Sequence, residues 1–447
     1  MDADLSRVVE TAALEGACER VFSGVDNSTD QRLRCGKWMF FHETFATIGP
    51  PSSILSFNLK HFSDTVFGPG FSNYGLIPFP GAPADAMPIG LQAQQAPLKA
   101  HAPFTCAACH FAQLPDGRYA VGAPNHAFRY GPFLMAFGAV FSLYNNADNP
   151  AVPPEVRELF RQPLAVKKMD QAFRSEFLIT SLGLLGEVFS GNVPQQTDEQ
   201  KAAFMTLQPG TMDFLTAPIA DDSVWSVSTI MPLWNLPNAQ ERLAAGMPHE
   251  MLSWTAGGHT LMGFLSGFVA IGKGDTTTWT HDRLRPLEEY IRSLKAPAGP
   301  AQDVAAVERG RLLFTEESCV DCHSGPSGMG TRPYTFDEMG TDNAMRLVFN
   351  PTMVPGGDVC CGLAGEPGDY TVTGGVKSPR LAGVWARPRL LHNGSVAGLE
   401  NLLCLNGNRP LLPQPPAASM GDHGHMMGCM TLTQAQKQDL VAYLKTL

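Results

Sequence analysis

Two segments decide how this chain is interpreted: Cys106-Ala107-Ala108-Cys109-His110 and Cys319-Val320-Asp321-Cys322-His323. Both read C-x-x-C-H, the pattern by which c-type haem is attached. Two residues between the cysteines let one turn present both sulfurs to the vinyl groups of a porphyrin, and the adjacent histidine then lies under the iron as proximal ligand. With 10 cysteines and 12 histidines in 447 residues, chance gives about 0.006 such matches. The sequence therefore predicts two covalently attached haem c groups, with His110 and His323 binding iron.

Two other interpretations of the paired cysteines are weaker. A zinc site made of two C-x-x-C pairs usually has about 15–20 residues between the pairs, whereas about 210 separate Cys109 from Cys319. A dithiol redox pair would not explain why a histidine follows the second cysteine in both copies.

Short amphipathic helices are expected around the second motif. Val304, Val307, Arg311 and Phe314 follow helical spacing just before it. A second helix is expected at the end of the chain. It begins with a capping box at Thr433 and carries an apolar stripe. A helix, a haem-binding turn, a loop and a terminal helix make up the layout of a cytochrome c domain.

The rest of the chain suggests two such domains behind an irregular start. A helix is expected to begin at Pro286, present one apolar face and stop before Pro297, and residues 296–300 form a Pro-rich linker. We therefore predict a mainly α fold with long loops, divided into an N-terminal extension (1–90), a first cytochrome c-like domain with insertions (91–297) and a second one (301–447). The 44 glycines and 36 prolines agree with long loops.

Composition excludes several classes of protein. Hydrophobic residues make up 44% and charged residues 17%, which is incompatible with a disordered chain. A net charge of −10 argues against nucleic acid as a partner. No apolar run reaches the about 20 residues of a membrane span, and no signal peptide is visible at the start of the sequence.

The remaining six cysteines bear on the compartment. Covalent haem attachment takes place outside the cytoplasm, so we expect a periplasmic or secreted protein in its mature form, with cysteines that can pair. Cys18 and Cys35 are a plausible disulfide. Cys360, Cys361, Cys404 and Cys429 could form two more in any of three connectivities.

At this point the chain resembles a known family, the dihaem cytochrome c peroxidase superfamily, and in its motifs the branch of dihaem rubber oxygenases. The resemblance covers roughly residues 100–447. The chain differs from the rubber oxygenases in its shorter length and at Arg387-Pro388-Arg389, where Ala-Pro-Tyr is more usual. The stretches that carry it are Asp116-Gly117-Arg118, Gly122-Ala123-Pro124-Asn125, residues 231–236 (MPLWNL), Gly340-Thr341-Asp342, residues 378–386 (SPRLAGVWA), residues 391–396 (LHNGSV) and Gly424-His425.

The resemblance implies a division of labour between the haems. One haem has an open or loosely held sixth position and meets dioxygen or hydrogen peroxide, and the other has two protein ligands and relays electrons. In the oxygenase and quinone-forming relatives the N-terminal haem is the reactive one. By this resemblance, His110 lies at the reactive haem and His323 at the relay haem.

Candidates for the second ligand of the C-terminal haem lie just before the last helix, where cytochrome c domains place it. His425 is the first choice, and His423, Met426 and Met427 are alternatives, as is a solvated loop without a ligand. His392 is a cofactor-binding candidate, although a histidine in such a turn more often hydrogen-bonds backbone or a haem propionate than binds iron.

Candidate catalytic residues lie between the motifs. Trp234 could carry an electron hole between the haems, and Glu250 could act as an acid–base group in O–O cleavage. His249, His259 and Met251 fall in a region expected to cover the first haem. Core packing for Trp234, a surface position for Glu250 and packed or surface positions for the others are the simpler interpretations.

The expected function is that of a dihaem oxidoreductase of the dioxygenase or peroxidase type. It would use dioxygen or hydrogen peroxide together with a small apolar substrate or a redox partner protein. A dihaem electron carrier without turnover is the alternative, but the roughly 175 residues between Phe111 and Pro286 exceed what a relay needs.

Overall fold

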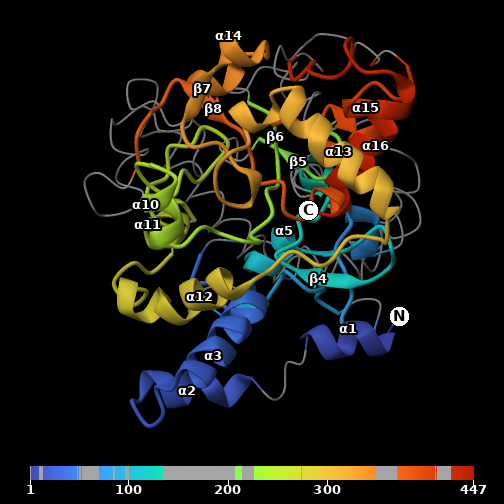
Figure 1. The fold of residues 1–447 in the computed structure, drawn as a ribbon. Helices are drawn as coiled ribbons and strands as arrows, with labels where there is room; N and C mark the ends of the chain where they lie inside the picture. Colours follow the sequence, from blue (N-terminus) through green and yellow to red (C-terminus); the bar gives the residue numbers. More distant parts are fainter. Residues whose placement is uncertain are drawn as a thin grey trace, which may run out of the picture.

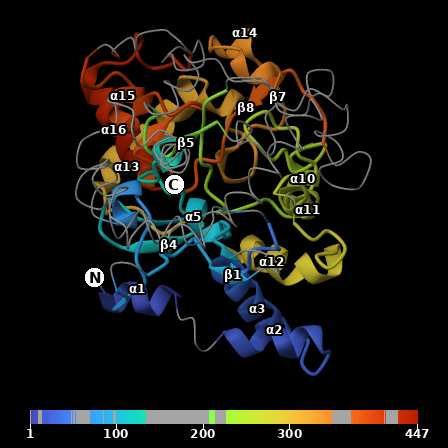
Figure 2. The same ribbon diagram turned by 180° about the vertical axis from the view of Figure 1, so that it is seen from behind.

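A computed structural model describes residues 2–9, 14–47, 70–83, 86–95, 100–133, 207–213, 226–272, 274–347, 370–407 and 424–447, together with positions 49, 52 and 409. The described part is mainly helical with long loops (Figures 1 and 2), which confirms that much of the expected fold class. The division into two haem domains and an extension stays a prediction.

The elements are short apart from a few helices. The α-helices are α1 (Asp2–Val9), α2 (Glu15–Phe22), α3 (Thr29–His42), α5 (Cys106–His110), α10 (Ala239–Ala244), α11 (Leu261–Ile271), α12 (His281–Ser293), α13 (Val304–Glu316), α14 (Phe336–Met339), α15 (Gly398–Leu402) and α16 (Gln434–Leu444). The 3-10 helices are η1 (Phe71–Tyr74), η3 (Cys319–Asp321), η4 (Pro326–Gly328), η5 (Ala344–Leu347) and η6 (Val384–Ala386).

Strands occur in the described residues as two-stranded antiparallel pairs. They are β1 (Gln94–Gln95) with β2 (Ala100–His101), β3 (Phe111–Gln113) with β4 (Tyr119–Val121), β5 (Thr211–Met212) with β6 (Ser228–Thr229), β7 (Pro333–Thr335) with β8 (Gly375–Lys377), and β9 (Arg389–Leu390) with β10 (Val396–Ala397). In the described residues each pair is a separate sheet rather than part of one extended sheet.

The N-terminal helices form a core with the first motif. A disulfide joins Cys18 of α2 to Cys35 of α3, as expected from the sequence. Helix α3 lies along α12 (Figure 1) so closely that a Cβ on Gly36 would lie 2.0 Å from the carbonyl oxygen of Pro286. Phe41 of α3 meets Phe111 edge to face at 5.3 Å, directly after the first motif. Residues far apart in the sequence thus support the first C-x-x-C-H turn.

Helix α12 begins earlier than the sequence predicted. It starts at His281 after Thr280, and Pro286 lies inside it rather than at its first position. The expected apolar face is present, since Leu287, Tyr290 and Ile291 are buried. A proline costs a helix one hydrogen bond, and here the packing of that face on α3 outweighs the loss.

The C-terminal part has a separate apolar core around the predicted helix pair. Helix α13 packs on α16 (Figure 1), and a Cβ on Gly310 would lie 2.0 Å from the carbonyl oxygen of Asp439. Leu313, Phe314 and Leu440 are buried in this core. The capping box of Thr433 and Gln436 is formed. Both helices expected around the second motif are therefore confirmed.

Candidate functional site

The second motif presents its histidine in a defined orientation. Cys319 lies in η3, and both cysteine thiols are free. The Nδ1 atom of His323 is hydrogen-bonded to the carbonyl oxygen of Gly328 at 2.6 Å. A bond of this kind fixes the tautomer of a metal-binding histidine and directs Nε2 toward the metal. His323 therefore has the arrangement of a proximal ligand.

His425 faces His323 across the same space. The ring centroids are 6.3 Å apart and the ring planes make an angle of 65°. Two imidazoles that bind one metal ion from opposite sides, each through a nitrogen at about 2.0 Å, have centroids about 6.3 Å apart. Burial, followed by the charges of His323 and Arg409, lowers the pKa of His425 to about 4, so the ring is neutral and able to act as a ligand at pH 7.

The loop that carries His425 is held from two sides. Arg409 donates to the carbonyl oxygens of Gly424 at 2.8 Å, of Leu402 at 2.6 Å and of His425 itself. A disulfide joins Cys404 to Cys429, which bracket this segment. It is one of the pairings left open by the sequence, while Cys360 and Cys361 lie outside the described residues. His425 has φ 51°, a left-handed conformation that such tethering can maintain.

The alternative ligands are less well placed. Met426 and Met427 are 47% and 42% exposed, so their side chains point largely to solvent rather than into the space facing His323. His423 lies outside the described residues. Of the described candidates, His425 alone faces His323.

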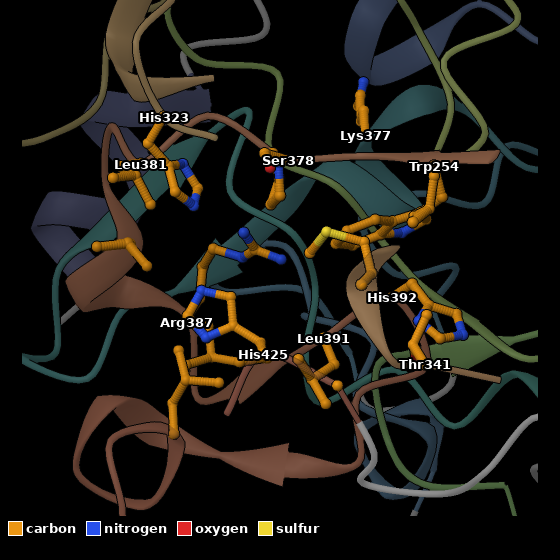
Figure 3. Close-up of a pocket in the computed structure, with 17 residues that line it drawn as sticks. Trp254, His323, Thr341, Lys377, Ser378, Leu381, Arg387, Leu391, His392 and His425 are labelled. Carbon is orange, nitrogen blue, oxygen red and sulfur yellow. The ribbon is translucent and has the colours of Figure 1, made fainter. Parts of the chain in front are cut away.

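A cavity joins these histidines (Figure 3). It has an empty volume of about 690 Å³, part of which opens to solvent. The lining is mostly apolar, from Leu381, Val384, Leu390, Leu391 and Leu402, as a porphyrin requires. The residues present here therefore fit a haem held by the two free cysteines, His323 and His425.

His392 lines the same cavity without facing His323 in this way. Its Nε2 atom lies 3.0 Å from Oδ2 of Asp342, close enough for an ion pair but not aligned as a hydrogen bond. Its ring meets Trp254 edge-on at 6.4 Å. This position agrees with the polar-contact interpretation of His392 better than with iron ligation.

The first motif is built differently. Its five residues form helix α5, and the hairpin β3–β4 follows at once. Asn125 clamps the turn, since its backbone N–H donates to Cys109 at 2.8 Å and its side chain to Ala108 at 3.0 Å. Burial lowers the pKa of His110 to about 4, and the backbone of Met231 opposes this shift. Among the described residues, Nδ1 of His110 has no hydrogen bond as well aligned as that of His323. The residue types here suit a haem, and the histidine is less firmly oriented than His323.

Trp234 lies between the two motif-bearing parts of the chain. It is 1% exposed, and its indole N–H donates to the carbonyl oxygen of Val121 at 2.8 Å. On one side a Cβ on Gly122 would lie 2.9 Å from the indole, and on the other a Cβ on Gly383 would lie 2.6 Å from it. Gly122 also donates to the carbonyl oxygen of His110 at 2.7 Å. The indole is therefore in van der Waals contact with both halves.

Glu250 is buried at 2% exposure, so the surface interpretation is wrong. Its carboxylate accepts from Arg292 at 2.6 Å and lies 3.5 Å from Arg242. His249 stacks on His259 with a centroid distance of 4.3 Å, and Nδ1 of His249 accepts from the backbone of Met251. These described contacts tie both candidates to neighbouring structure, and none of them reaches His110.

The weaker interpretations of the motifs gain no support. Burial raises the pKa of Cys106 and of Cys109 to about 12, and mainly burial raises that of Cys319 to about 11. A dithiol redox pair needs a lowered thiol pKa instead. Within the described ranges, no three His, Cys, Asp or Glu side chains come together as a zinc site requires. Within the same ranges, every helix is too short or too polar to cross a bilayer.

Comparison with known proteins gives a distant likeness. No protein-family model and no curated protein matches the chain. Among solved structures, hydrazine synthase of Kuenenia stuttgartiensis pressurised with 20 bar xenon aligns with 54% of this chain and 77% of its own, at 19% identity and a TM-score of 0.32. A likeness at this level says nothing further about the activity of this chain.

Several residues of the site were missed in the sequence. Arg409 reaches it through bonds to backbone carbonyl oxygens that no side-chain pattern reveals, and Asp342 was noted only within a stretch that carries the family resemblance. Arg387 was visible only as a departure from the rubber-oxygenase pattern.

Proposed function

We propose that this chain is a dihaem c-type cytochrome oxidoreductase that acts on dioxygen or hydrogen peroxide at the N-terminal motif, with the C-terminal haem as an electron relay. The observation that carries the proposal is the facing pair His323 and His425 on an apolar cavity beside free Cys319 and Cys322. A haem with two histidine ligands has no open position, so this site suits electron storage rather than oxygen chemistry.

The protein's own contribution at the relay site is to fix both ligands and to line the cavity with apolar side chains. The bond from His323 to Gly328 orients one imidazole, and the Arg409 contacts with the Cys404–Cys429 disulfide hold the other. When bound, haem supplies the iron that exchanges electrons and, at an open position, binds oxygen species. The apolar lining lowers the local dielectric, and the dielectric around a haem influences its reduction potential.

The N-terminal motif is proposed as the reactive site because its histidine is the less firmly held of the two. Trp234 is in position to shorten the path between the two sites, since it touches a glycine from each half. His249 and Glu250 remain candidate acid–base residues only if the first haem reaches them. The two disulfides among the described residues agree with an extracytoplasmic location, and we propose a periplasmic or secreted protein.

Absorption and electron paramagnetic resonance spectra of the purified full chain test the proposal. The expected result is two haems per chain, one low-spin with two histidine ligands and one high-spin that responds to carbon monoxide or peroxide. Two low-spin haems in every oxidation state would instead favour a dihaem electron carrier, and a chain without haem absorbance would refute both.

A further inference from the structure

Arg387 is a buried cation, and the described part of the chain gives it no partner of opposite charge. It follows η6, is 2% exposed and lines the cavity shared by His323 and His425 (Figure 3). Its Nε and Nη2 atoms are buried and have no hydrogen-bond partner among the described residues. A buried guanidinium with open donors is strongly unfavourable, so a missing anion is the simplest explanation for its presence.

Two further arginines, Arg380 and Arg389, lie near Arg387 or the basic groups beside it. Burial, together with nearby Arg380, lowers the pKa of Arg387 to about 10. Burial, together with Arg387 and Arg389, lowers the pKa of His126 to about 3, and both ring nitrogens of His126 are buried without a partner in the described structure. Lys377 has its pKa lowered well below the usual value by burial, by Arg380 and by Arg387.

Acidic side chains near the cavity are already engaged. Glu250 is paired with Arg292 and Arg242, and Asp342 is paired with His392. Neither forms an ion pair with Arg387 in the described structure. Among these described side chains, positive charge therefore exceeds negative charge around Arg387, and a bound anion would balance it.

Arg387 differs from its neighbour Lys377 in being free to bind. The Lys377 ammonium donates to the carbonyl oxygen of Met251 at 2.6 Å, and Figure 3 shows it directed away from the other labelled side chains. Arg387 is instead steadied over the ring of Trp254 at 5.8 Å, and that indole donates to the carbonyl oxygen of Thr229. The guanidinium is thus positioned while two of its nitrogens stay open.

We propose that Arg387 binds a propionate carboxylate of the haem held by His323 and His425. A guanidinium presents forked donors that match a carboxylate. A haem bound between the two histidines in this cavity carries propionate carboxylates, and these can supply the anion for Arg387. The inference deepens the proposed function and depends on it only in requiring a haem at the second site.

The experiment uses the full chain with its haems attached and compares Arg387→Gln, Arg387→Lys and the control Arg311→Gln. Arg311 is an exposed arginine on α13 paired with Glu308, so it matches the charge change away from the cavity. The readouts are the propionate bending band in the resonance Raman spectrum and the midpoint potential of the low-spin haem from spectroelectrochemistry.

Arg387→Gln is expected to shift the propionate band and to lower the potential, because an unpaired carboxylate favours the ferric state. The ratio of reduced to oxidised haem at a fixed applied potential should fall on the order of tenfold. Arg387→Lys should shift the band with a smaller fall in potential, since lysine keeps the positive charge but lacks the paired donors of a guanidinium. Arg311→Gln should change neither.

The proposal is overturned if Arg387→Gln matches Arg311→Gln in both readouts. It is also overturned if the band stays fixed while the potential responds to added phosphate or chloride, which would indicate a soluble anion. If Arg387→Gln does not yield folded protein, the propionate band of Arg387→Lys decides the question, and an unshifted band overturns the proposal. A chain without haem refutes the proposed function itself, whereas haem without these responses refutes only the role of Arg387.

Discussion

His425 is the residue on which the relay assignment depends. Replacing it with alanine should remove one of two axial ligands, so the C-terminal haem should become high-spin and bind carbon monoxide. The measurement is electron paramagnetic resonance of the ferric protein, in which the low-spin signal should be almost entirely lost. His392→Ala is the matched control, because His392 lines the same cavity. A low-spin signal that survives in His425→Ala and disappears in His392→Ala would reverse the assignment.

Glu250 offers a test between a structural and a catalytic role. Its contacts with Arg292 and Arg242 predict that Glu250→Gln lowers the free energy of unfolding by about 2 kcal/mol, while turnover changes less than about twofold. Chemical denaturation and steady-state kinetics measure the two effects. Glu288→Gln is the control, since Glu288 shares Arg292 but is less buried, and it should cost less stability. A turnover rate that falls on the order of a hundredfold at unchanged stability would point to acid–base catalysis instead.

At the scale of elements, the Cys404–Cys429 disulfide should position the His425 loop. The double variant Cys404→Ser/Cys429→Ser should lose about 3 kcal/mol of stability and part of the low-spin signal, because the loop that carries His425 then loses its covalent restraint. Spectra recorded during a denaturant titration measure both effects.

The Cys18–Cys35 disulfide provides a matched control. It closes a loop of similar length, with a sequence separation of 17 against 25, and lies among the N-terminal helices. Cys18→Ser/Cys35→Ser should cost similar stability with the low-spin signal intact. Equal loss of the signal in both double variants would show that the disulfide acts on overall stability rather than on the ligand.

Local sequence signals predicted the elements that depend on local chemistry. The capping box at Thr433 and the helix over 304–316 are decided by neighbours within one turn, so their sequence patterns suffice. The start of α12 was missed because tertiary packing keeps Pro286 inside a helix. The contact of Arg387 with Trp254 lies far away in the sequence, and the contacts of Arg409 are to backbone carbonyl oxygens, which no side-chain pattern reveals.

For the whole molecule, the sequence indicated the motifs but not how the two halves meet. The C-x-x-C-H spacing reveals each haem turn separately, and the approach of His425 to His323 followed from its place before the last helix. The position of Trp234 against Gly122 and Gly383 could not be derived, since it depends on how separate segments pack. Its role as a bridge between the sites therefore has to be tested directly.

Replacing Trp234 with phenylalanine should slow electron exchange between the haems while leaving both in place. Phenylalanine fills most of the space between Gly122 and Gly383, but it is harder to oxidise and cannot donate to Val121. After mixing the reduced protein with hydrogen peroxide, stopped-flow absorption should show oxidation of the low-spin haem slowed on the order of tenfold or more. Trp385→Phe is the control, since Trp385 packs beside Trp234 and donates to the carbonyl oxygen of Pro297 instead. Equal rates in wild type and Trp234→Phe, with low-spin and high-spin signals unchanged, would show that the indole serves packing alone and that electrons take another path.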